Sequence, residues 1–340
     1  MEKPVVEEKA SDLNSARTVQ KSPFQKFLTK WALQLGIIGV AFVVWIVFVI
    51  GSPRTFLAPQ IYRAFMQTTP FFALVAIPAT LVVITKETDL SFPSVMAWGV
   101  TCFVLVYKAT NSLWLGFIAC LLGGLIAGWL NGFLIVKVGI PSMVATIGTQ
   151  YLWRGIVLVV TDGTGTSLVS AKDSVLHSLL VGRWHNIPSQ FIWTIIFAVA
   201  IWIFLNHTRK GAHIYLTGDN TESAGLMGIN TQATKTLTFC IVGVAAAFAG
   251  LISSMEVTYF WPTLGDGYLL KTLASIFLGG TSVFGGTGTI LGTFVASFII
   301  GAIEAGIVAS GLTGFWTQLI YGLIIVTSLS VQTALSKRLR

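Results

Sequence analysis

The sequence predicts an all-α protein, a polytopic transmembrane helical bundle of about ten spans. Three observations predict it: 54% of the 340 residues are hydrophobic, only 10% are charged, and the mean hydropathy is +0.80. Soluble domains carry roughly 25% charged residues, so this chain lacks the charge for a water-facing surface, which excludes a soluble enzyme. The formal charge of +8 suits basic cytoplasmic loops and does not indicate nucleic-acid binding.

Ten apolar segments approach or exceed the ~20 residues that a helix needs to cross the hydrocarbon layer. The third and the eighth are short, with Gly or Pro at their ends, which favours broken or re-entrant helices beside a pathway. The ten segments are 31–50, 61–85, 92–107, 113–136, 142–160, 190–206, 236–255, 268–280, 288–309 and 315–334. Residues 31–334 are therefore the predicted transmembrane domain, between an N-terminal tail (1–30) and a C-terminal tail (335–340).

The distribution of Lys and Arg predicts the orientation, because cytoplasmic loops are enriched in both. With the N-terminus inside and ten crossings, only seven of the 21 basic residues fall outside the cytoplasmic set. These seven are Arg54, Arg63, Lys108, Arg154, Lys172, Arg183 and Lys271. We therefore expect a multi-pass protein of the bacterial cytoplasmic (inner) membrane with both tails in the cytoplasm.

The loop 207–235 is the longest polar stretch on the predicted cytoplasmic side. Within it, Asn220 or Thr221 can cap a short helix whose first turn carries Glu222, a favourable charge at the positive end of a helix. Gly228 can end that helix. A short capped helix between two spans suits docking to a cytoplasmic partner. The alternative is a solvated loop with an incidental turn.

Two ionisable residues, Arg154 and Glu304, lie well inside predicted spans, where charges are costly and are usually paired or functional. The hypothesis is that they form an ion pair with each other. The alternatives are hydrogen bonds to the carbonyls of a broken helix, and contact with a polar substrate. Near the predicted external mouth, Phe260 and Trp261 offer faces for a sugar to stack on, although packing in an aromatic belt or lid is the commoner use.

Two groups of glycines have different patterns. Gly124, Gly128 and Gly132 share one helix face, which favours close helix packing within the subunit over a dimer seam. The cluster 279–288 has the composition of a phosphate-binding loop, but a Walker A loop requires a Lys and none occurs between Lys271 and Lys337. We therefore expect no nucleotide binding by this chain. The Cys and His residues lack metal-ligand spacing, so neither a metal site nor a catalytic set is predicted.

Four stretches match the patterns of one family, in the family's order. Residues 210–230, which include Glu-x-Ala-x3-Gly, are similar to "GRxIYAIGGNxEAARLSGI", and residues 276–290 are similar to "VLGGTSLxGGxGSI". Residues 141–155 are similar to "PxFIxTLGTxxxxRG", and residues 89–97 to "GGIDLSVGSxMAL". The chain thus resembles the permease subunits of ribose/xylose/galactose-type (carbohydrate uptake) ABC importers.

The resemblance implies a type II ABC importer-like fold and a transport subunit that is not itself an enzyme. ATP and Mg would bind to a separate ABC ATPase subunit, and a periplasmic or extracellular binding protein would deliver a sugar or sugar-like solute. A second permease would complete a homo- or heterodimer in the lipid membrane. The implied ATPase-coupling residues are Asp219, Asn220, Thr221, Glu222, Ala224 and Gly228. The pathway or gating candidates within the matched stretches are Asp89, Ser91, Thr146, Thr149, Arg154, Gly279, Gly280, Thr281 and Ser282, and Glu304 joins them for its charge inside a predicted span.

One turn departs from the family pattern. Lys86-Glu87-Thr88 stands where the family has Gly-Gly-Ile, and Phe92-Pro93 where it has Val-Gly, which should stiffen the turn. The departure indicates another substrate or a second, non-identical permease; pentoses, hexoses, sugar alcohols, a furanosyl signal and nucleosides all remain open. The alternatives are an ion-coupled secondary transporter of a small polar solute, for which only Glu304 qualifies as an intramembrane carboxylate, and an intramembrane enzyme.

Overall fold

A computed structural model describes residues 23–309, 311 and 313–338, and shows a helical protein with two small two-stranded sheets. The first half of the described chain contains α2 (Pro23–Gly51), α3 (Pro53–Phe56), α4 (Pro59–Thr68), α5 (Pro70–Ile84), α6 (Phe92–Thr110), α7 (Leu113–Phe133), the π-helical turn η2 (Leu134–Val138) and α8 (Ser142–Thr161). The connection to the second half contains β1 (Thr166–Ser167), η3 (Val169–Ala171), α9 (Val175–Val181), β2 (Arg183–Trp184) and β3 (Ile187–Pro188). The remaining elements are α10 (Ser189–His207), α11 (Arg209–Asp219), α12 (Thr221–Leu226), α13 (Thr231–Glu256), β4 (Tyr259–Phe260), α14 (Tyr268–Leu278), α15 (Ile290–Ala309) and α16 (Phe315–Arg338).

The all-α fold is confirmed, but the count of spans is lower than the predicted ten. Six helices among the described residues are long and apolar enough to cross a membrane, or up to seven with the bent pair α4–α5. Three shorter apolar stretches correspond to the first, eighth and tenth predicted spans: Ile37–Gly51, Tyr268–Leu278 and Phe315–Ser330. An 11-residue helix such as α14 rises only ~16 Å, which explains why apolar composition overstates the number of crossings.

Proline placement explains two further differences from expectation. The predicted second span is broken between α4 and α5, which are bent by 54° at a break before Pro70, because a proline starts a helix readily but disrupts its interior. The predicted third span is not broken: α6 is a 19-residue helix. Its Pro93 lies in the first turn, where no backbone hydrogen bond is lost.

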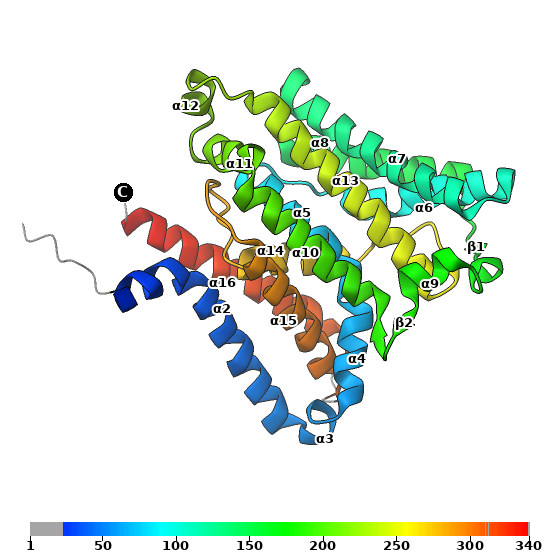
Figure 1. Ribbon diagram of the computed structural model, residues 1–340, viewed down its shortest axis with the longest axis horizontal. Helices are drawn as coiled ribbons and strands as arrows, with labels where there is room; N and C mark the ends of the chain where they lie inside the picture. Colours follow the sequence, from blue (N-terminus) through cyan, green and yellow to red (C-terminus); the bar gives the residue numbers. More distant parts are fainter. Residues whose placement is uncertain (1–22, 310, 312, 339–340) are drawn as a thin grey trace, which may run out of the picture.

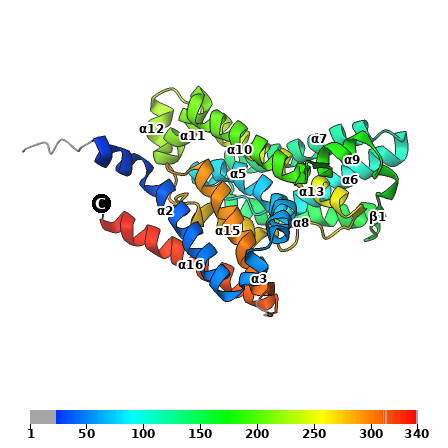
Figure 2. The same cartoon turned by 60° about the horizontal axis from the view of Figure 1, so that its bottom comes forward.

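The two ends of the molecule differ in structure. Figure 1 shows α11 and α12 on the same side as the described start of α2 and the end of α16, and β1, β2 and α9 at the opposite end; Figure 2 agrees. Of the predicted N-terminal tail, residues 1–22 lie outside the described residues, and residues 23–30 belong to α2. Of the predicted C-terminal tail, residues 335–338 continue α16, and residues 339–340 lie outside the described residues.

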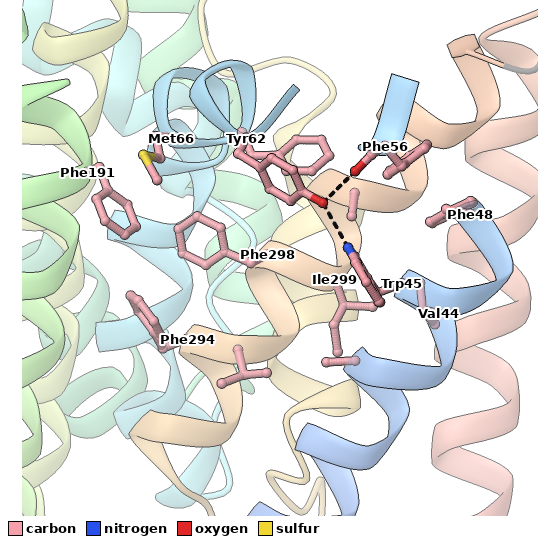
Figure 3. Close-up of a pocket in the computed structure, with 14 residues that line it drawn as sticks. Val44, Trp45, Phe48, Phe56, Tyr62, Met66, Phe191, Phe294, Phe298 and Ile299 are labelled. Atoms are coloured by element: carbon pink, nitrogen blue, oxygen red, sulfur yellow. Dashed lines mark hydrogen bonds between the residues drawn. The ribbon is translucent and has the colours of Figure 1, made fainter. Parts of the chain in front are cut away.

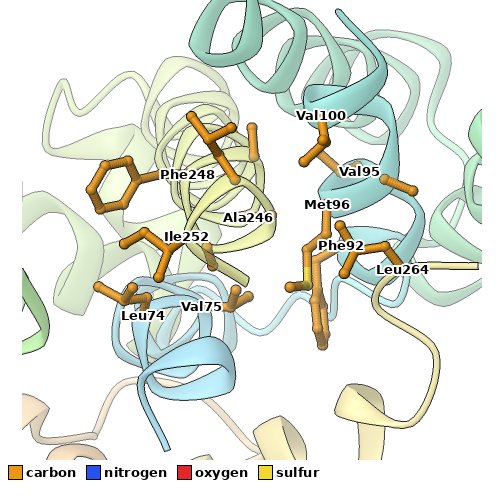
Figure 4. Packing of buried hydrophobic residues seen from close by; sticks show 14 of the residues in the cluster. Leu74, Val75, Phe92, Val95, Met96, Val100, Ala246, Phe248, Ile252 and Leu264 are labelled. Carbon is orange, nitrogen blue, oxygen red and sulfur yellow. The ribbon is translucent and has the colours of Figure 1, made fainter. Parts of the chain in front are cut away.

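The hydrophobic core surrounds α13, which packs against α5, α6 and α7. Figure 4 shows Ile252 and Phe248 of α13 facing Leu74 of α5 and lying across from Met96 and Val100 of α6. Every residue of α5 is buried, as is typical of a helix that is hydrophobic on all sides. The core therefore holds α5 away from lipid and directs its end towards the α11–α12 side.

The glycine stripe on α7 allows α13 to approach closely, as the spacing predicts. A side chain at Gly124 would meet the carbonyl oxygen of Gly243, and one at Gly128 would meet that of Phe239. A Cβ at Gly132 would lie 2.8 Å from the Cα of Thr236. The stripe thus packs against α13 within the subunit. Small residues generally allow helices in membranes to approach one another closely.

Replacing Gly124 with Val is expected to destabilise the protein by about 3 kcal/mol, because the new side chain would push against the backbone of α13. The midpoint of thermal unfolding in detergent, followed by tryptophan fluorescence, measures this effect. Gly148→Ala on α8 is the matched control, since nothing lies within 4 Å of its added Cβ, and it should leave the midpoint unchanged or raise it slightly. Equal midpoints for Gly124→Val and the native protein would contradict the packing argument.

Candidate coupling and translocation site

The loop 207–235 contains the short capped helix that the sequence predicts. The Asn220 side chain accepts a hydrogen bond from the Ser223 backbone N–H at 2.9 Å and so caps α12. Glu222 lies in the first turn of α12. Gly228 follows the helix with φ of +81°, a conformation that glycine adopts without strain. Of the two predicted caps, Asn220 performs this role, while the Thr221 hydroxyl bonds back to the carbonyl of Thr217.

Two exposed apolar side chains on this helix were not identified from the sequence. Leu226 is 86% exposed and Met227 is 62% exposed, whereas Ala224 is buried against the rest of the protein. Large apolar side chains that project from a polar loop are typical of a protein contact surface. The sequence signal was an apolar pair inside a polar segment. Helical periodicity alone did not show whether these side chains pack inside the protein or face outward.

The turn that connects α5 to α6, residues 85–91, is the point where α11 meets the membrane bundle. Lys86 has φ of +65°, a strained conformation for any residue but glycine, and its Nζ donates to the carbonyl of Asp219 at 2.8 Å. Glu87 forms an ion pair with Lys235 of α13 at 2.5 Å. Two of the residues that depart from the family's Gly-Gly-Ile therefore bond this turn to the end of α11 and to the start of α13.

The glycine cluster 279–288 packs against the same turn, through backbone rather than side-chain contacts. The Gly286 N–H donates to the carbonyl of Ile84, the last residue of α5, at 2.9 Å. A side chain at Gly218 of α11 would meet the same carbonyl, and one at Gly285 would meet the Lys86 side chain. The structure therefore shows close backbone packing at these glycines.

Four predicted pathway residues come together directly behind this turn. The Asp89 carboxylate accepts hydrogen bonds from the Ser91 N–H at 2.8 Å and the Ser91 hydroxyl at 2.7 Å. Asn131 of α7, absent from the predicted set, joins them: its Nδ2 donates to the Ser91 Oγ at 2.7 Å, and its Oδ1 accepts from the Thr149 hydroxyl at 2.6 Å. Thr146, one turn before Thr149 on α8, donates to the carbonyl of Ser142 at 2.7 Å. The sequence signal for Asn131 was a lone asparagine in an apolar, Gly-rich predicted span.

Burial controls the electrostatics of this polar network. Asp89 is only 6% exposed, and desolvation raises its pKa, although the hydrogen bonds from Ser91 and Phe92 oppose the shift. The carboxylate accepts hydrogen bonds, and no basic side chain among the described residues forms an ion pair with it. Charge at Asp89 is therefore costly, and the network depends on every donor being present.

The predicted pair between Arg154 and Glu304 is wrong. Arg154 on α8 donates to the backbone carbonyls of Pro262 and, at 3.0 Å, of Leu264, and its guanidinium lies 2.8 Å from the carboxylate of Asp266. The bonds go to backbone carbonyls, as one alternative expected, but these carbonyls belong to the non-helical segment between β4 and α14 and not to a broken helix. Arg154 does not pair with Glu304 because the 257–267 segment, which belongs to the second half of the chain, places two backbone carbonyls and the Asp266 carboxylate against the guanidinium.

Glu304 on α15 pairs with Lys271 on α14. The Lys271 Nζ lies 2.7 Å and 2.6 Å from the two carboxylate oxygens. The Lys271 ammonium also lies 5.7 Å from the ring centre of Tyr268 and 5.9 Å from that of Phe72. With both oxygens bonded to an ammonium, Glu304 does not provide the free intramembrane carboxylate that ion-coupled transport requires.

The remaining candidates, residues 279–282, follow α14 and lie apart from the polar network and from the Lys271–Glu304 pair. Gly280 ends α14 with φ of +82°, and the carbonyl of Thr281 accepts from Gln332 of α16 at 3.1 Å. The Ser282 hydroxyl accepts from the Phe284 N–H, and Gly279 packs against the backbone of α15. Phe260 is fully buried, so packing, and not sugar stacking, is its use here.

An apolar pocket of about 320 Å³ lies between α2, α4, α10 and α15 (Figure 3). Its polar groups satisfy one another: the Trp45 indole donates to the Tyr62 hydroxyl at 2.8 Å, which donates to the carbonyl of Phe56 at 2.6 Å. The figure shows Phe294 and Phe298 lining another wall. This pocket therefore offers a polar solute few hydrogen bonds. In the part of the chain that the structure describes, no three His, Cys, Asp or Glu side chains gather as a metal site.

A bundle of apolar helices, with a short capped helix at one end and a buried polar network behind the neighbouring turn, is the arrangement of a membrane permease. The chain belongs to the family described as "Branched-chain amino acid transport system / permease component", whose model matches residues 61–329. It is the permease component of an ATP-driven import system and forms part of a multi-pass membrane assembly that includes an ATPase and a binding protein.

Curated relatives support this assignment over most of the chain. The autoinducer 2 import system permease protein LsrC of Yersinia pseudotuberculosis serotype O:3 (strain YPIII) is 32% identical over 80% of this chain and 77% of that relative. The protein of the same name from Photorhabdus luminescens is 33% identical over 75% of this chain and 76% of its own length.

Proposed function

We propose that this chain forms the transmembrane pathway through which an ABC importer moves a sugar-like solute across the bacterial cytoplasmic membrane. Two observations support the solute class: the relatives import autoinducer 2 by name, and the sequence motifs resemble those of carbohydrate permeases. ATP and Mg bind to the partner ATPase. A periplasmic or extracellular binding protein delivers the solute, and a second permease, identical or not, completes the pathway.

The α12 helix is the contact for the ATPase, and this single feature carries the proposal. It is capped at Asn220 and closed by Gly228, so its position is rigid, and it presents Leu226 and Met227 outward. Exposed apolar side chains at the centre of a contact account for much of its binding energy. Asp219, Thr221, Glu222 and Ala224 complete the helix and its flank.

Movement of α12 passes to the pathway through the 85–91 turn. Asp219 at the end of α11 is bonded to Lys86, and Gly218 packs against Ile84, so displacement of α11 pulls directly on the end of α5. The same turn continues into Asp89 and Ser91. The polar network and the glycine cluster 279–288 are therefore the gating elements that the ATPase controls.

Placing α12 in the cytoplasm also orients the rest of the molecule. The described start of α2 and the end of α16 lie at the same end as α12 (Figure 1), which supports cytoplasmic termini, in agreement with the distribution of basic residues. The opposite end carries the 161–189 connection and the 257–267 segment. That end faces the solute-binding protein.

Replacing Leu226 with Asp is expected to lower the amount of ATPase that co-purifies with the permease at least ~10-fold, since burying an unpaired carboxylate in an apolar contact costs more than the ~1.4 kcal/mol of a tenfold loss. The measurement is affinity purification of tagged permease after co-expression with its ATPase, followed by an assay of ATP-dependent uptake. Val169→Asp is the matched control, because Val169 is 59% exposed at the opposite end. Undiminished ATPase recovery with Leu226→Asp would refute the role of α12.

A further inference from the structure

A second cavity, of about 610 Å³, lies against the broken helix and contains the Lys271–Glu304 pair. The walls come from α3, α4, α5, α14 and α15. Its volume is within the ~300–1,000 Å³ range of small-molecule sites. The pocket in Figure 3 is lined almost entirely by apolar side chains, whereas this cavity combines an ion pair with aromatic rings, which is a different chemistry.

The break between α4 and α5 forms one wall of the cavity. Substrate sites in transporters are commonly built at discontinuous helices, where backbone groups are released from helical hydrogen bonding. At this break, the Thr69 hydroxyl is fully buried and has no hydrogen-bond partner among the described residues. It faces Gly301, which lines the cavity and leaves no room for a side chain there.

The ion pair retains hydrogen-bonding capacity towards the cavity. Lys271 has three N–H donors and uses two of them on Glu304, while each carboxylate oxygen keeps a free lone pair. A hydroxyl group both donates and accepts, so it can bond to both partners without separating them. A zwitterion would have to open the pair to satisfy its own charges, because the pair as it stands is neutral.

The aromatic rings supply the second half of a polyol site. Phe71 and Tyr268 line the cavity, with the ammonium of Lys271 close to the Tyr268 ring. A ring compound with hydroxyl groups has apolar C–H faces that pack on aromatic side chains, while its hydroxyls need donors and acceptors at the rim. Both features stand within one cavity on membrane-embedded helices.

We infer that the cavity at Lys271 and Glu304 is a low-affinity contact site for a neutral, cyclic polyhydroxylated solute on its way across the membrane. This inference rests on the proposed function and adds the residues that meet the solute. The pair acts by hydrogen bonding to solute hydroxyls, and Tyr268 and Phe71 pack against the ring. Because the solute carries no charge, its release separates no ion pair between solute and protein.

The test uses the complete importer, this chain with its ATPase and binding protein, in proteoliposomes. Uptake of D-ribose, D-xylose, D-galactose and myo-inositol is measured together with ATP hydrolysis. Lys271→Met and Glu304→Gln are each expected to lower uptake of the transported compound about tenfold, through loss of a charge-assisted hydrogen bond. ATP hydrolysis stimulated by the binding protein should stay within about twofold of the native rate.

Two further variants separate solute contact from a structural role. Ala305→Trp fills the cavity and should block uptake while ATP hydrolysis continues. Lys137→Met removes an exposed lysine of η2 that does not line the cavity and should change neither rate. Uptake and hydrolysis that fall together in the Lys271 and Glu304 variants would show that the pair only supports folding, and would overturn the inference.

The remaining outcomes also decide the question. Unchanged uptake in all the cavity variants would refute the solute site at Lys271 and Glu304 but leave the proposed function intact. ATP-dependent uptake of L-leucine that depends on Lys271, with none of the polyols transported, would replace a polyol site by a zwitterion site. A native importer that transports none of the four polyols would contradict the proposed solute class before any variant is compared.

Discussion

Replacing Arg154 with Met is expected to destabilise the protein by roughly 3 kcal/mol and to abolish transport, because it leaves two buried carbonyl acceptors unpaired, at about 1–3 kcal/mol each. Pro262 and Leu264, which carry those carbonyls, are both buried. The 257–267 segment that contains them includes β4, which pairs with β1 at the end of the molecule opposite α12. Loss of Arg154 therefore releases the connection that holds this end together. The midpoint of thermal unfolding in detergent measures the effect.

Three companion variants identify which bond of Arg154 matters. Asp266→Asn should cost less than ~1 kcal/mol, because Asp266 is 60% exposed and exposed ion pairs contribute little. Arg154→Lys retains the charge but lacks the planar fork that reaches several acceptors, so it should fall between the native protein and Arg154→Met. Arg63→Met, at an exposed position on α4, is the control. If Asp266→Asn is as damaging as Arg154→Met, the ion pair and not the carbonyls stabilises this segment.

Asn131→Leu is expected to have the second large effect, a loss of roughly 2–3 kcal/mol together with most of the transport activity. The Asn131 side chain bridges Ser91 and Thr149, and a leucine of similar size removes both the donor to the Ser91 Oγ and the acceptor of the Thr149 hydroxyl at a buried site. Since Asn131 holds the start of α6 to α7 and α8, uptake should fall even where some folded protein remains. The exposed Asn206 on α10 is the matched control, and Asn206→Leu should be close to neutral.

The pH dependence distinguishes the geometry of this network from the charge of Asp89. Burial raises the Asp89 pKa, so the folded state binds the proton more tightly than the unfolded state, and this contribution to stability is lost as the pH rises through the folded pKa. Lowering the pH should therefore raise the stability of the native protein relative to that of Asp89→Asn. Asn131→Leu should remain destabilised throughout. Recovery of Asn131→Leu at low pH would assign its defect to the charge instead.

Features set by local spacing were predictable from the sequence. The Asn220 cap, the Gly228 terminus and the packing of Gly124 follow from neighbours a few residues away, or from the face that a helical period defines. The ten apolar segments are all helical in whole or part, since apolar length selects helices in a membrane. Which of them are long enough to cross depends on breaks such as Pro70, which hydropathy does not detect.

The pairing of charges was not predictable. Arg154 and Asp266 are 112 residues apart, and Lys271 and Glu304 lie on different helices; charge alone allows Arg154 to pair with either acid. The path of the 257–267 segment decides the outcome, and it depends on tertiary packing. The same holds for Asn131. In the sequence it is only a polar residue in an apolar span, and its partners on the neighbouring elements become apparent only in the folded structure.

Lys86 has a consequence for how this protein responds to selection. Its backbone conformation, φ +65°, costs a side-chain-bearing residue of order 1 kcal/mol relative to glycine, and glycine is what the related pattern has at this position. Selection for heat resistance alone therefore favours glycine there. The bond from the lysine ammonium to the Asp219 carbonyl would be lost in that exchange. A thermostabilised form obtained this way would be a better crystallisation target and a worse transporter.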